Sequence, residues 1–248
     1  MKTLYTIGDS WTYGFDLENP KRECYPYLLS QKFGCGLVNE ALPAAPNDWM
    51  FRKTIEWVCK YKGNYEDLFV IVGWSIPYRR EENFKFYYGG PLKWLLSHYG
   101  KEEWVHPHSR FISKHFYNNE LSTIKSLSYL ITLQEFLKSK NINYLFYQPF
   151  AEILIPKDKW NRFNKNKGID PNGKCPHECA KWCDCYWIDG TNYTDMVSNI
   201  DKKYLIGPDF GDFDSYQIAW TEERHPNKKE QSSISDFVEY KMKELYSL

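Results

Sequence analysis

The chain has 248 residues, of which 42% are hydrophobic and 26% are charged. This composition is typical of a globular protein with a sizeable core and excludes an intrinsically disordered chain. The 32 basic residues balance 32 acidic ones, so no global field favours nucleic acid or an anionic membrane as a partner. No window approaches the roughly 20 apolar residues that span a bilayer, and no signal peptide is recognisable. We therefore expect a cytoplasmic protein with a single domain over residues 1–248.

Short β-prone runs alternate with segments of helical periodicity. Strands are expected at Leu4–Ile7, Gly36–Asn39, Leu68–Val72 and Tyr144–Tyr147, with Tyr186–Ile188 or Tyr204–Ile206 as the fifth. Helices are expected after Asn47 with Phe51, Ile55 and Val58 on one face, over residues 121–138 with Ile124, Leu127 and Ile131, and after Asn227 with Ile234, Phe237, Val238, Met242 and Leu245. This alternation predicts an α/β fold, a three-layer α/β/α sandwich around a parallel sheet of about five strands. Its site is expected at the carboxyl ends of the strands.

Two long insertions interrupt the alternation. Residues 77–119 are rich in aromatic and charged side chains, and residues 151–198 contain four of the seven cysteines. Both are longer than ordinary connections, so we interpret them as lids or substrate loops. His106 and His108, in the first insertion, are interpreted as loop residues.

The residues Gly8-Asp9-Ser10 directly follow the first expected strand. A serine becomes a nucleophile when it lies on a tight turn at a strand end, near a histidine base and amide donors for the oxyanion. Near the other end of the chain, Glu222 precedes His225 by three residues. At that spacing a carboxylate can bond Nδ1 of the imidazole and leave Nε2 to face the serine. The alternative is a solvated charged turn that caps the last helix.

Together, the two ends of the chain resemble the SGNH (GDSL-type) serine hydrolase family. The family signature is a GDS block after the first strand and a D-x-x-H-P block before the last helix. The resemblance implies a flavodoxin-like strand order, with Ser10 as nucleophile, His225 as general base and Glu222 as the acid, where the family normally has Asp. The chain also looks like a divergent branch of viral and phage proteins, which implies a virion or the host cytoplasm as its location.

The oxyanion-hole residues of that family are only partly matched. Family members have a glycine in the loop after the second strand, and this chain has none there. The backbone N–H of Ala44 or Ala45 is therefore the candidate donor beside that of Ser10. The side-chain amide of Asn47 either donates to the oxyanion or caps the next helix. Ser75 takes the place of the family's oxyanion asparagine, and loss of one such donor lowers kcat about 100- to 1000-fold.

The chain is rich in aromatic side chains, with 10 tryptophans and 20 tyrosines. Such side chains form the floor of carbohydrate sites as well as hydrophobic cores. The candidate substrate-binding residues are Asp9, Trp11, Trp74 and Arg79. Arg79 suits an anionic substrate group, and the alternative is an ordinary surface arginine.

The second insertion contains a cysteine cluster, formed by Cys175, Cys179, Cys183 and Cys185. Four thiolates suit tetrahedral zinc, which would stabilise an insertion that lacks its own core. The alternatives are two disulfides or reduced thiols. Any zinc here is expected to be structural, and no cofactor is expected for catalysis. The other three cysteines are expected to be buried free thiols.

These features predict a serine esterase or deacetylase. The preferred substrate is an O-acetylated carbohydrate, with a small lipid or aryl ester as another option. The alternative is a catalytically degenerate binding protein on the same scaffold, with the cysteine-rich insertion as its interaction module.

Overall fold

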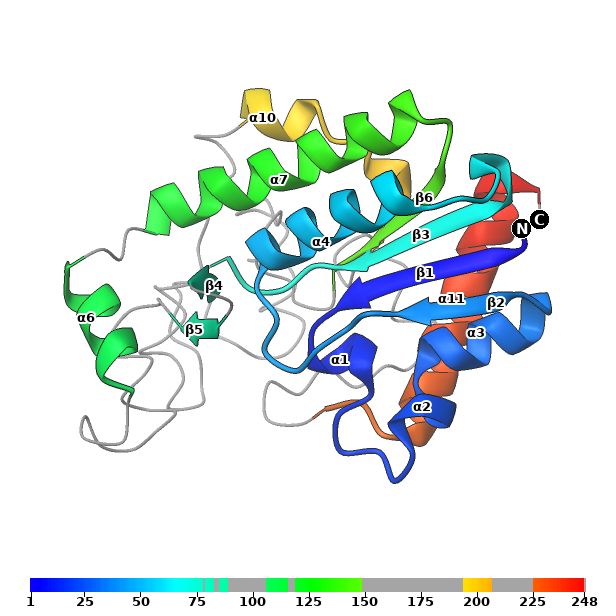
Figure 1. Ribbon diagram of the computed structural model, residues 1–248, viewed down its shortest axis with the longest axis horizontal. Coiled ribbons are helices and arrows are strands. Elements are labelled where there is room, and N and C mark those ends of the chain that lie inside the picture. The colour runs from blue at the N-terminus through cyan, green and yellow to red at the C-terminus, as the bar shows by residue number, and fades with distance from the viewer. Residues whose placement is uncertain are drawn as a thin grey trace, which may run out of the picture.

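A five-stranded parallel sheet lies at the centre of the molecule (Figure 1). The computed structural model describes residues 1–77, 79–82, 85–88, 106–115, 119–148, 194–206 and 225–247. The strands are β1 (Thr3–Gly8), β2 (Gly36–Asn39), β3 (Leu68–Gly73), β6 (Asn143–Tyr147) and β7 (Leu205–Ile206). Their order, β2-β1-β3-β6-β7, confirms the flavodoxin-like sheet, in which the strand progression reverses between β1 and β3.

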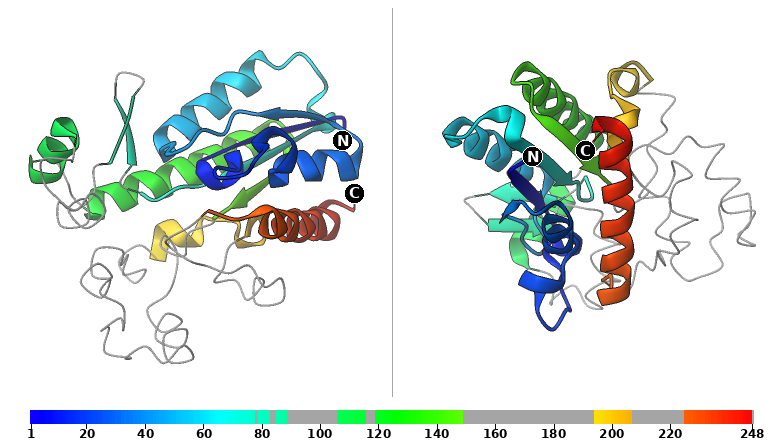
Figure 2. Two further views of the ribbon diagram at one scale, coloured as in Figure 1. Left: turned by 90° about the horizontal axis from the view of Figure 1, so that it is seen from below. Right: turned by 90° about the vertical axis from the view of Figure 1, so that its right-hand side faces the viewer.

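Helices cover both faces of this sheet, with α4 on one side and α11 on the other (Figure 2). The helices α4 (Asn47–Lys60) and α7 (Asn119–Ser139) pack on one face, and α3 (Tyr25–Phe33) and α11 (Lys228–Tyr246) pack on the other. All six residues of β3 are buried, because Val70 and Val72 face the first pair of helices while Phe69 and Ile71 face the second. The expected three-layer sandwich is confirmed.

Shorter elements complete the described part of the chain. They are α1 (Ser10–Tyr13), α2 (Pro20–Glu23), α6 (Pro107–His115), α10 (Thr194–Ser198), the 3-10 turns η1 (Tyr65–Asp67) and η4 (Lys202–Tyr204), and the antiparallel strands β4 (Arg79–Glu82) and β5 (Lys85–Tyr88). The β4–β5 hairpin and α6 lie beyond the carboxyl ends of the sheet strands (Figure 1). The interpretation of His108 as a loop residue is wrong, because it lies in the first turn of α6.

The last helix follows the prediction closely. Helix α11 begins after Asn227, whose side chain accepts from the backbone N–H of Glu230, while the Glu230 carboxylate accepts from the N–H of Asn227. This reciprocal capping fixes where the helix starts. The apolar side chains of the expected face are buried or partly buried in the core between α3 and the sheet.

Helix α7 has the expected extent but buries a different face. Of the expected stripe, Leu127 is fully buried, whereas Ile124 and Ile131 are only partly buried. The buried face instead continues through Leu130, Leu133 and Leu137, and its amino-terminal half is polar, with Ser122, Thr123 and Ser126. The spacing of the apolar residues alone predicted the wrong buried face, because small polar side chains also occupy the buried face of this helix.

The remaining sequence predictions about secondary structure and cysteines have mixed outcomes. Tyr204–Ile206 contains the fifth strand, β7, and Tyr186–Ile188 lies outside the described residues, as does the cysteine cluster. Cys24, Cys35 and Cys59 are free thiols, but only Cys24 is buried and Cys59 is exposed. Burial raises the pKa of the Cys24 thiol.

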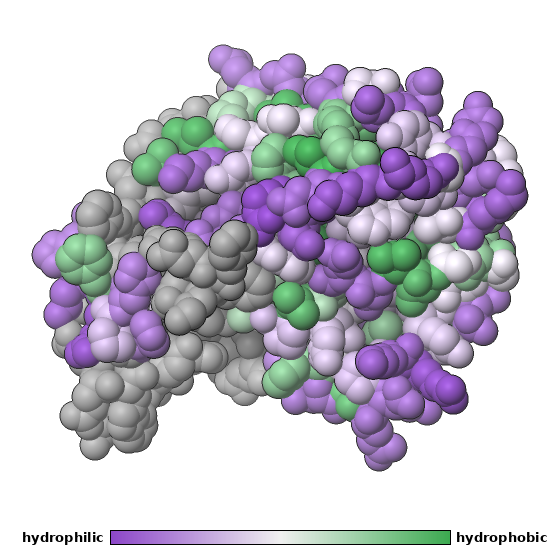
Figure 3. Space-filling model, in the orientation of Figure 1, coloured by the Kyte–Doolittle hydropathy of each residue, from purple (hydrophilic) through white to green (hydrophobic). Residues whose placement is uncertain are grey.

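On the face drawn in Figure 3, a strip of hydrophilic side chains runs along α4. Arg52 and Glu56 of α4 form an ion pair at 2.5 Å. Within the described segments, no helix combines the length and the hydrophobicity that crossing a membrane requires.

Candidate active site

Ser10 lies at the carboxyl end of β1, where the strand order of the sheet reverses. Strand β1 ends at Gly8, Asp9 caps α1, and Ser10 is the first residue of that short helix. The Asp9 carboxylate accepts from the backbone N–H of Trp11 at 3.1 Å, and Ser10 is only 7% exposed. In open α/β sheets, ligands bind at this topological switch point.

Two glycines allow α1 to pack directly on the strand ends. Gly8 and Gly73 are partners in the β1–β3 register. A Cβ built on Gly8 would lie 2.1 Å from Thr12 Oγ1, and a Cβ built on Gly73 would lie 2.4 Å from the same atom. Because no other residue type leaves this space open, the two glycines determine how closely α1, and with it Ser10, approaches the sheet.

Asp9, Ser75 and Arg79 form a buried polar triangle beside Ser10. Arg79 donates to Asp9 Oδ2 at 2.8 Å and to Ser75 Oγ at 2.6 Å, and Ser75 Oγ donates to Asp9 Oδ2 at 3.1 Å. The side chains of Asp9 and Arg79 are 0% and 10% exposed. The interpretation of Arg79 as an ordinary surface arginine is therefore wrong. The single hydroxyl hydrogen of Ser75 is directed at Asp9 in this arrangement.

Strand β4 carries Arg79 and is anchored to the start of α4. Arg52 contacts both carboxylate oxygens of Glu81, at 3.1 and 2.5 Å. The backbone N–H of Glu81 donates to the carboxylate of Asp48, at 3.1 Å to the nearer oxygen. Burial raises the pKa of that carboxyl group. These contacts hold β4 at the same end of the sheet as Ser10.

Asn47 joins α4 to the loop after β3. Pro46 is the cap of α4, so the prediction that Asn47 caps this helix is wrong. Asn47 Oδ1 instead accepts from the Ser75 backbone N–H at 2.7 Å, while Nδ2 donates to the Ser75 carbonyl at 2.9 Å and to Ser126 Oγ at 3.3 Å. Both amide hydrogens are engaged, so Asn47 holds Ser75 in place rather than offering a free donor.

The loop after β2 runs alongside the end of β1. The backbone N–H of Leu42 donates to the Gly8 carbonyl at 3.1 Å, and that of Ala45 donates to the Leu42 carbonyl at 3.1 Å. Ala44, between them, has a φ of 62°, in the left-handed region that favours glycine. Within the described part of the chain, its backbone N–H donates no hydrogen bond. Ala44 thus adopts a backbone conformation that is more usual for glycine.

Trp11 and Trp74 belong to the cores. Trp11 is 6% exposed and packs with α3 and α11, and Trp74 is 1% exposed and packs edge-on against Phe146 at 5.5 Å. Their burial leaves little surface for the substrate contact that the sequence suggested. Burial, with a smaller contribution from the Asp9 charge, raises the pKa of Tyr25 and Tyr147 beneath the site.

His225 lies next to the residues that follow α1. Its Nδ1 is 2.9 Å from Asp16 Oδ2, and its ring is 4.9 Å from that of Phe15. Glu222 lies outside the described residues. The described part of the chain contains no hydrogen bond between Ser10 and His225. No group of three potential ligands that could hold a metal occurs within the described segments.

Gln231, which the sequence did not single out, connects the two ends of the chain. Its fully buried side chain donates to the Trp11 carbonyl at 3.0 Å and accepts from the Tyr25 backbone N–H at 2.8 Å. It therefore ties α11 to α1 and α3 within the first turn or so of α11, close in sequence to His225. No local pattern marks such a residue, since its partners are backbone groups more than 200 positions away.

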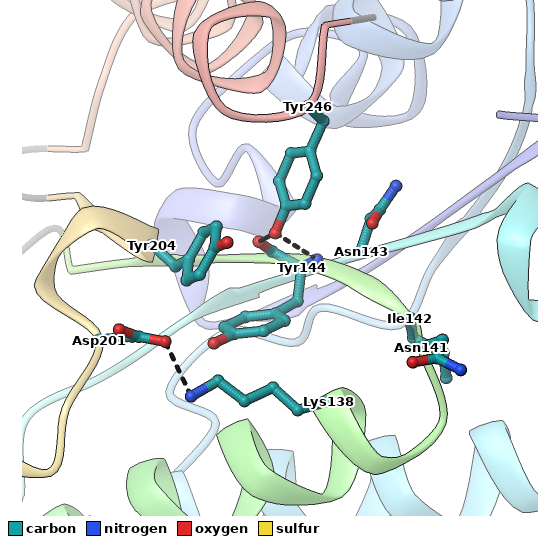
Figure 4. Close-up of a pocket in the computed structure, with 8 residues that line it drawn as sticks. All are labelled: Lys138, Asn141, Ile142, Asn143, Tyr144, Asp201, Tyr204 and Tyr246. Carbon is teal, nitrogen blue, oxygen red and sulfur yellow. Dashed lines mark hydrogen bonds and ion pairs between the residues drawn. The ribbon is translucent and has the colours of Figure 1, made fainter.

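A cavity of about 310 Å³ lies at the opposite end of the sheet from Ser10, around the amino-terminal end of β6 (Figure 4). The Tyr246 hydroxyl there donates to the Tyr144 carbonyl at 2.7 Å and accepts from the Tyr144 N–H at 3.1 Å. Tyr204 stacks on Tyr246, with 5.6 Å between ring centroids, and Lys138 pairs with Asp201 at 2.7 Å. These contacts attach the end of α11 to β6, far along the strands from Ser10.

Comparisons with known proteins agree with the fold. The structure is similar to that of psychrotrophic esterase EstA from Pseudoalteromonas sp., described as inhibited by monoethylphosphonate. The identity is 14%, the TM-score is 0.51, and the alignment covers 100% of both chains. It is also similar to LAE5, an alpha/beta hydrolase enzyme from the metagenome of Lake Arreo, at 16% identity and a TM-score of 0.51, over 97% of this chain and 94% of the other. The fold is therefore one that hydrolases use.

No curated protein matches the chain. A family model does match, over residues 14–154, more than half of the sequence. That stretch extends from the end of α1 to beyond β6 and includes the loops that carry Asp16, Ala44 and Ser75, and strand β4, which carries Arg79. The chain belongs to this family, which is described as a family of unknown function (DUF6071).

Proposed function

We propose that this protein is a serine esterase of the SGNH type, with Ser10 as nucleophile and His225 as general base. The observation that carries the proposal is the meeting of the two ends of the chain at one sheet edge. Ser10 starts α1, and His225 contacts Phe15 and Asp16, which follow that helix. Gln231 holds the two helices together. A nucleophile and a base from distant segments need such a connection to stay in register.

In the proposed reaction, His225 takes the proton of the Ser10 hydroxyl as Ser10 Oγ attacks the ester carbonyl. The backbone N–H groups of Ser10 and Ala44 donate to the oxyanion that forms. His225 then gives the proton to the leaving alcohol, which leaves the acyl group on Ser10. A water molecule, deprotonated by His225, attacks this acyl group, and His225 returns the proton to Ser10 Oγ as the acid is released. Ser75 and Asn47 are bonded to their neighbours, so we assign them the positioning of this edge rather than direct contact with the oxyanion.

The proposed substrate is a short-chain ester, with acetylated carbohydrate preferred. The support is the aromatic first insertion, whose β4–β5 hairpin lies past the carboxyl ends of the strands (Figure 1). We assign Arg79 a role at the substrate-binding edge. Because its charge is balanced by Asp9, it suits a polar neutral substrate better than a strongly anionic one.

The test is hydrolysis of p-nitrophenyl acetate, p-nitrophenyl butyrate and acetylated xylan by the wild type and by Ser10→Ala and His225→Ala. Turnover that falls at least about 100-fold in both variants supports the proposal. Ser232→Ala, at an exposed position on α11, is the matched control and should retain full activity. Absence of turnover on every ester would favour the alternative, a binding protein on this scaffold. The engaged donors of Asn47 and Ser75 are the observation in its favour.

A further inference from the structure

The hydrogen-bond partner of His225 is an aspartate that comes from the nucleophile's own end of the chain. Nδ1 of His225 and Oδ2 of Asp16 are 2.9 Å apart, although 209 positions separate the two residues. An ionised carboxylate has no hydrogen to donate, so Nδ1 carries the hydrogen in this contact. The neutral imidazole then has its free lone pair on Nε2, which is the atom that a general base needs.

The backbone holds Asp16 in an unusual conformation for this contact. The backbone N–H groups of Gly14 and Phe15 both donate to the Ser10 carbonyl at 3.0 Å, and the N–H of Leu17 donates to the Gly14 carbonyl at 3.3 Å. These bonds form a compact turn directly after Ser10. Asp16 lies in it with a φ of 68°, a left-handed conformation that is uncommon for residues other than glycine.

Such strain persists where the surroundings determine the conformation, and it clusters at functional sites. Here the turn places the Phe15 ring against the His225 ring, with 4.9 Å between centroids, and the Asp16 carboxylate at Nδ1. One turn therefore contacts both the ring and one nitrogen of the imidazole. The ring cannot rotate without losing one of these contacts.

We infer that Asp16, rather than Glu222, is the residue that orients His225 for catalysis. This inference rests on the proposed function and deepens it, because it takes the acid of the triad from the turn after the nucleophile. Asp16 acts through His225 and does not touch the substrate, so it is a positioning residue. Its side chain is 64% exposed, so solvent screens its charge, and its main effect is on the tautomer and orientation of the ring.

The test compares Asp16→Asn, Asp16→Ala and Glu222→Gln, with Glu18→Gln as the matched loss of an exposed carboxylate from the same loop. An asparagine amide can donate to Nδ1 and so favour the tautomer with hydrogen on Nε2, which cannot accept the serine proton. Asp16→Asn should therefore lower kcat for p-nitrophenyl acetate about 100-fold, and Asp16→Ala about 10-fold, with little change in KM. Glu222→Gln and Glu18→Gln should stay within about twofold of the wild type.

A ¹⁵N NMR measurement of the His225 tautomer supplies a readout that a merely structural role would not move. Hydrogen on Nδ1 in the wild type and on Nε2 in Asp16→Asn supports the inference. If Ser10→Ala and His225→Ala abolish hydrolysis while both Asp16 variants remain active and Glu222→Gln does not, the inference is overturned and the proposed function stands. Hydrolysis that is indifferent to Ser10, or absent in the wild type, would overturn both.

Discussion

The buried ion pair between Asp9 and Arg79 is the contact whose removal has the most readily calculated effect. Replacing Arg79 with Met keeps the volume of the side-chain stem and removes the charge that faces Asp9 at 2.8 Å. Removing one partner of a buried pair costs about 3–5 kcal/mol, because the other charge is left uncompensated. Asp9 would keep its bonds from Trp11 and Ser75, so we expect about 3 kcal/mol, at the lower end of that range.

For a chain of this size, the expected loss corresponds to a fall in Tm of about 6–12 °C. The measurement is urea unfolding followed by circular dichroism, with Arg22→Met, at an exposed position on α2, as a control that should change the free energy of unfolding by less than about 0.5 kcal/mol. Adding Asp9→Asn to Arg79→Met should recover at least about 1 kcal/mol, because no unpaired charge remains. A cost below about 1 kcal/mol for Arg79→Met, or a double variant less stable than the single one, would refute this reasoning.

Three further predictions concern Gly8, Gln231 and the cysteine cluster. Gly8→Ala should lower the free energy of unfolding by about 1–3 kcal/mol and reduce esterase activity, because the new Cβ would lie 2.1 Å from Thr12 Oγ1. The measurement is urea unfolding, and the control is Gly36→Ala, whose Cβ meets only the Lys2 carbonyl at 3.6 Å. Gln231→Leu should cost about 2 kcal/mol or more and lower kcat, since it removes the partner of the Trp11 carbonyl and the Tyr25 N–H; unchanged kcat in a destabilised variant would contradict its role in holding α11 against α1. Elemental analysis of the purified protein distinguishes the alternatives for the cysteine cluster: a zinc site predicts about one zinc per chain, released when the thiols of Cys175, Cys179, Cys183 and Cys185 are modified, and metal-free protein with two disulfides or four reduced thiols would contradict it.

The sheet was predictable because its signal is local. Strand β3 is apolar at successive positions since both of its faces are buried, and Gly8 and Gly73 mark the strand ends where the chain turns. The order of these segments, alternating with helices, was enough to predict the layers and the edge of the sheet that carries Ser10. The cap at Asn227 likewise follows from residues three positions apart.

The contacts of the site were less predictable because they join distant segments. Asp16 is an exposed acidic residue in a turn, and only the fold brings it to His225. Arg79 could be interpreted as a surface residue because the residues near it in the sequence do not indicate that its partner, Asp9, lies 70 positions earlier. Asn47 is a residue type that often caps helices, but its side-chain amide bonds to the backbone of Ser75 and not to that of its own helix. Polar complementarity across the fold decided these three positions, and periodicity does not encode it.

The central claim, that Ser10 is the nucleophile, is tested most directly by reaction with a fluorophosphonate followed by mass spectrometry of the peptides. This reagent is an electrophile that forms a stable bond with an activated serine. We predict one phosphonyl group per chain, located on Ser10, absent in Ser10→Ala and formed at least about 100-fold more slowly in His225→Ala. Labelling at another residue, no labelling of the folded wild type, or labelling unaffected by His225→Ala would contradict it.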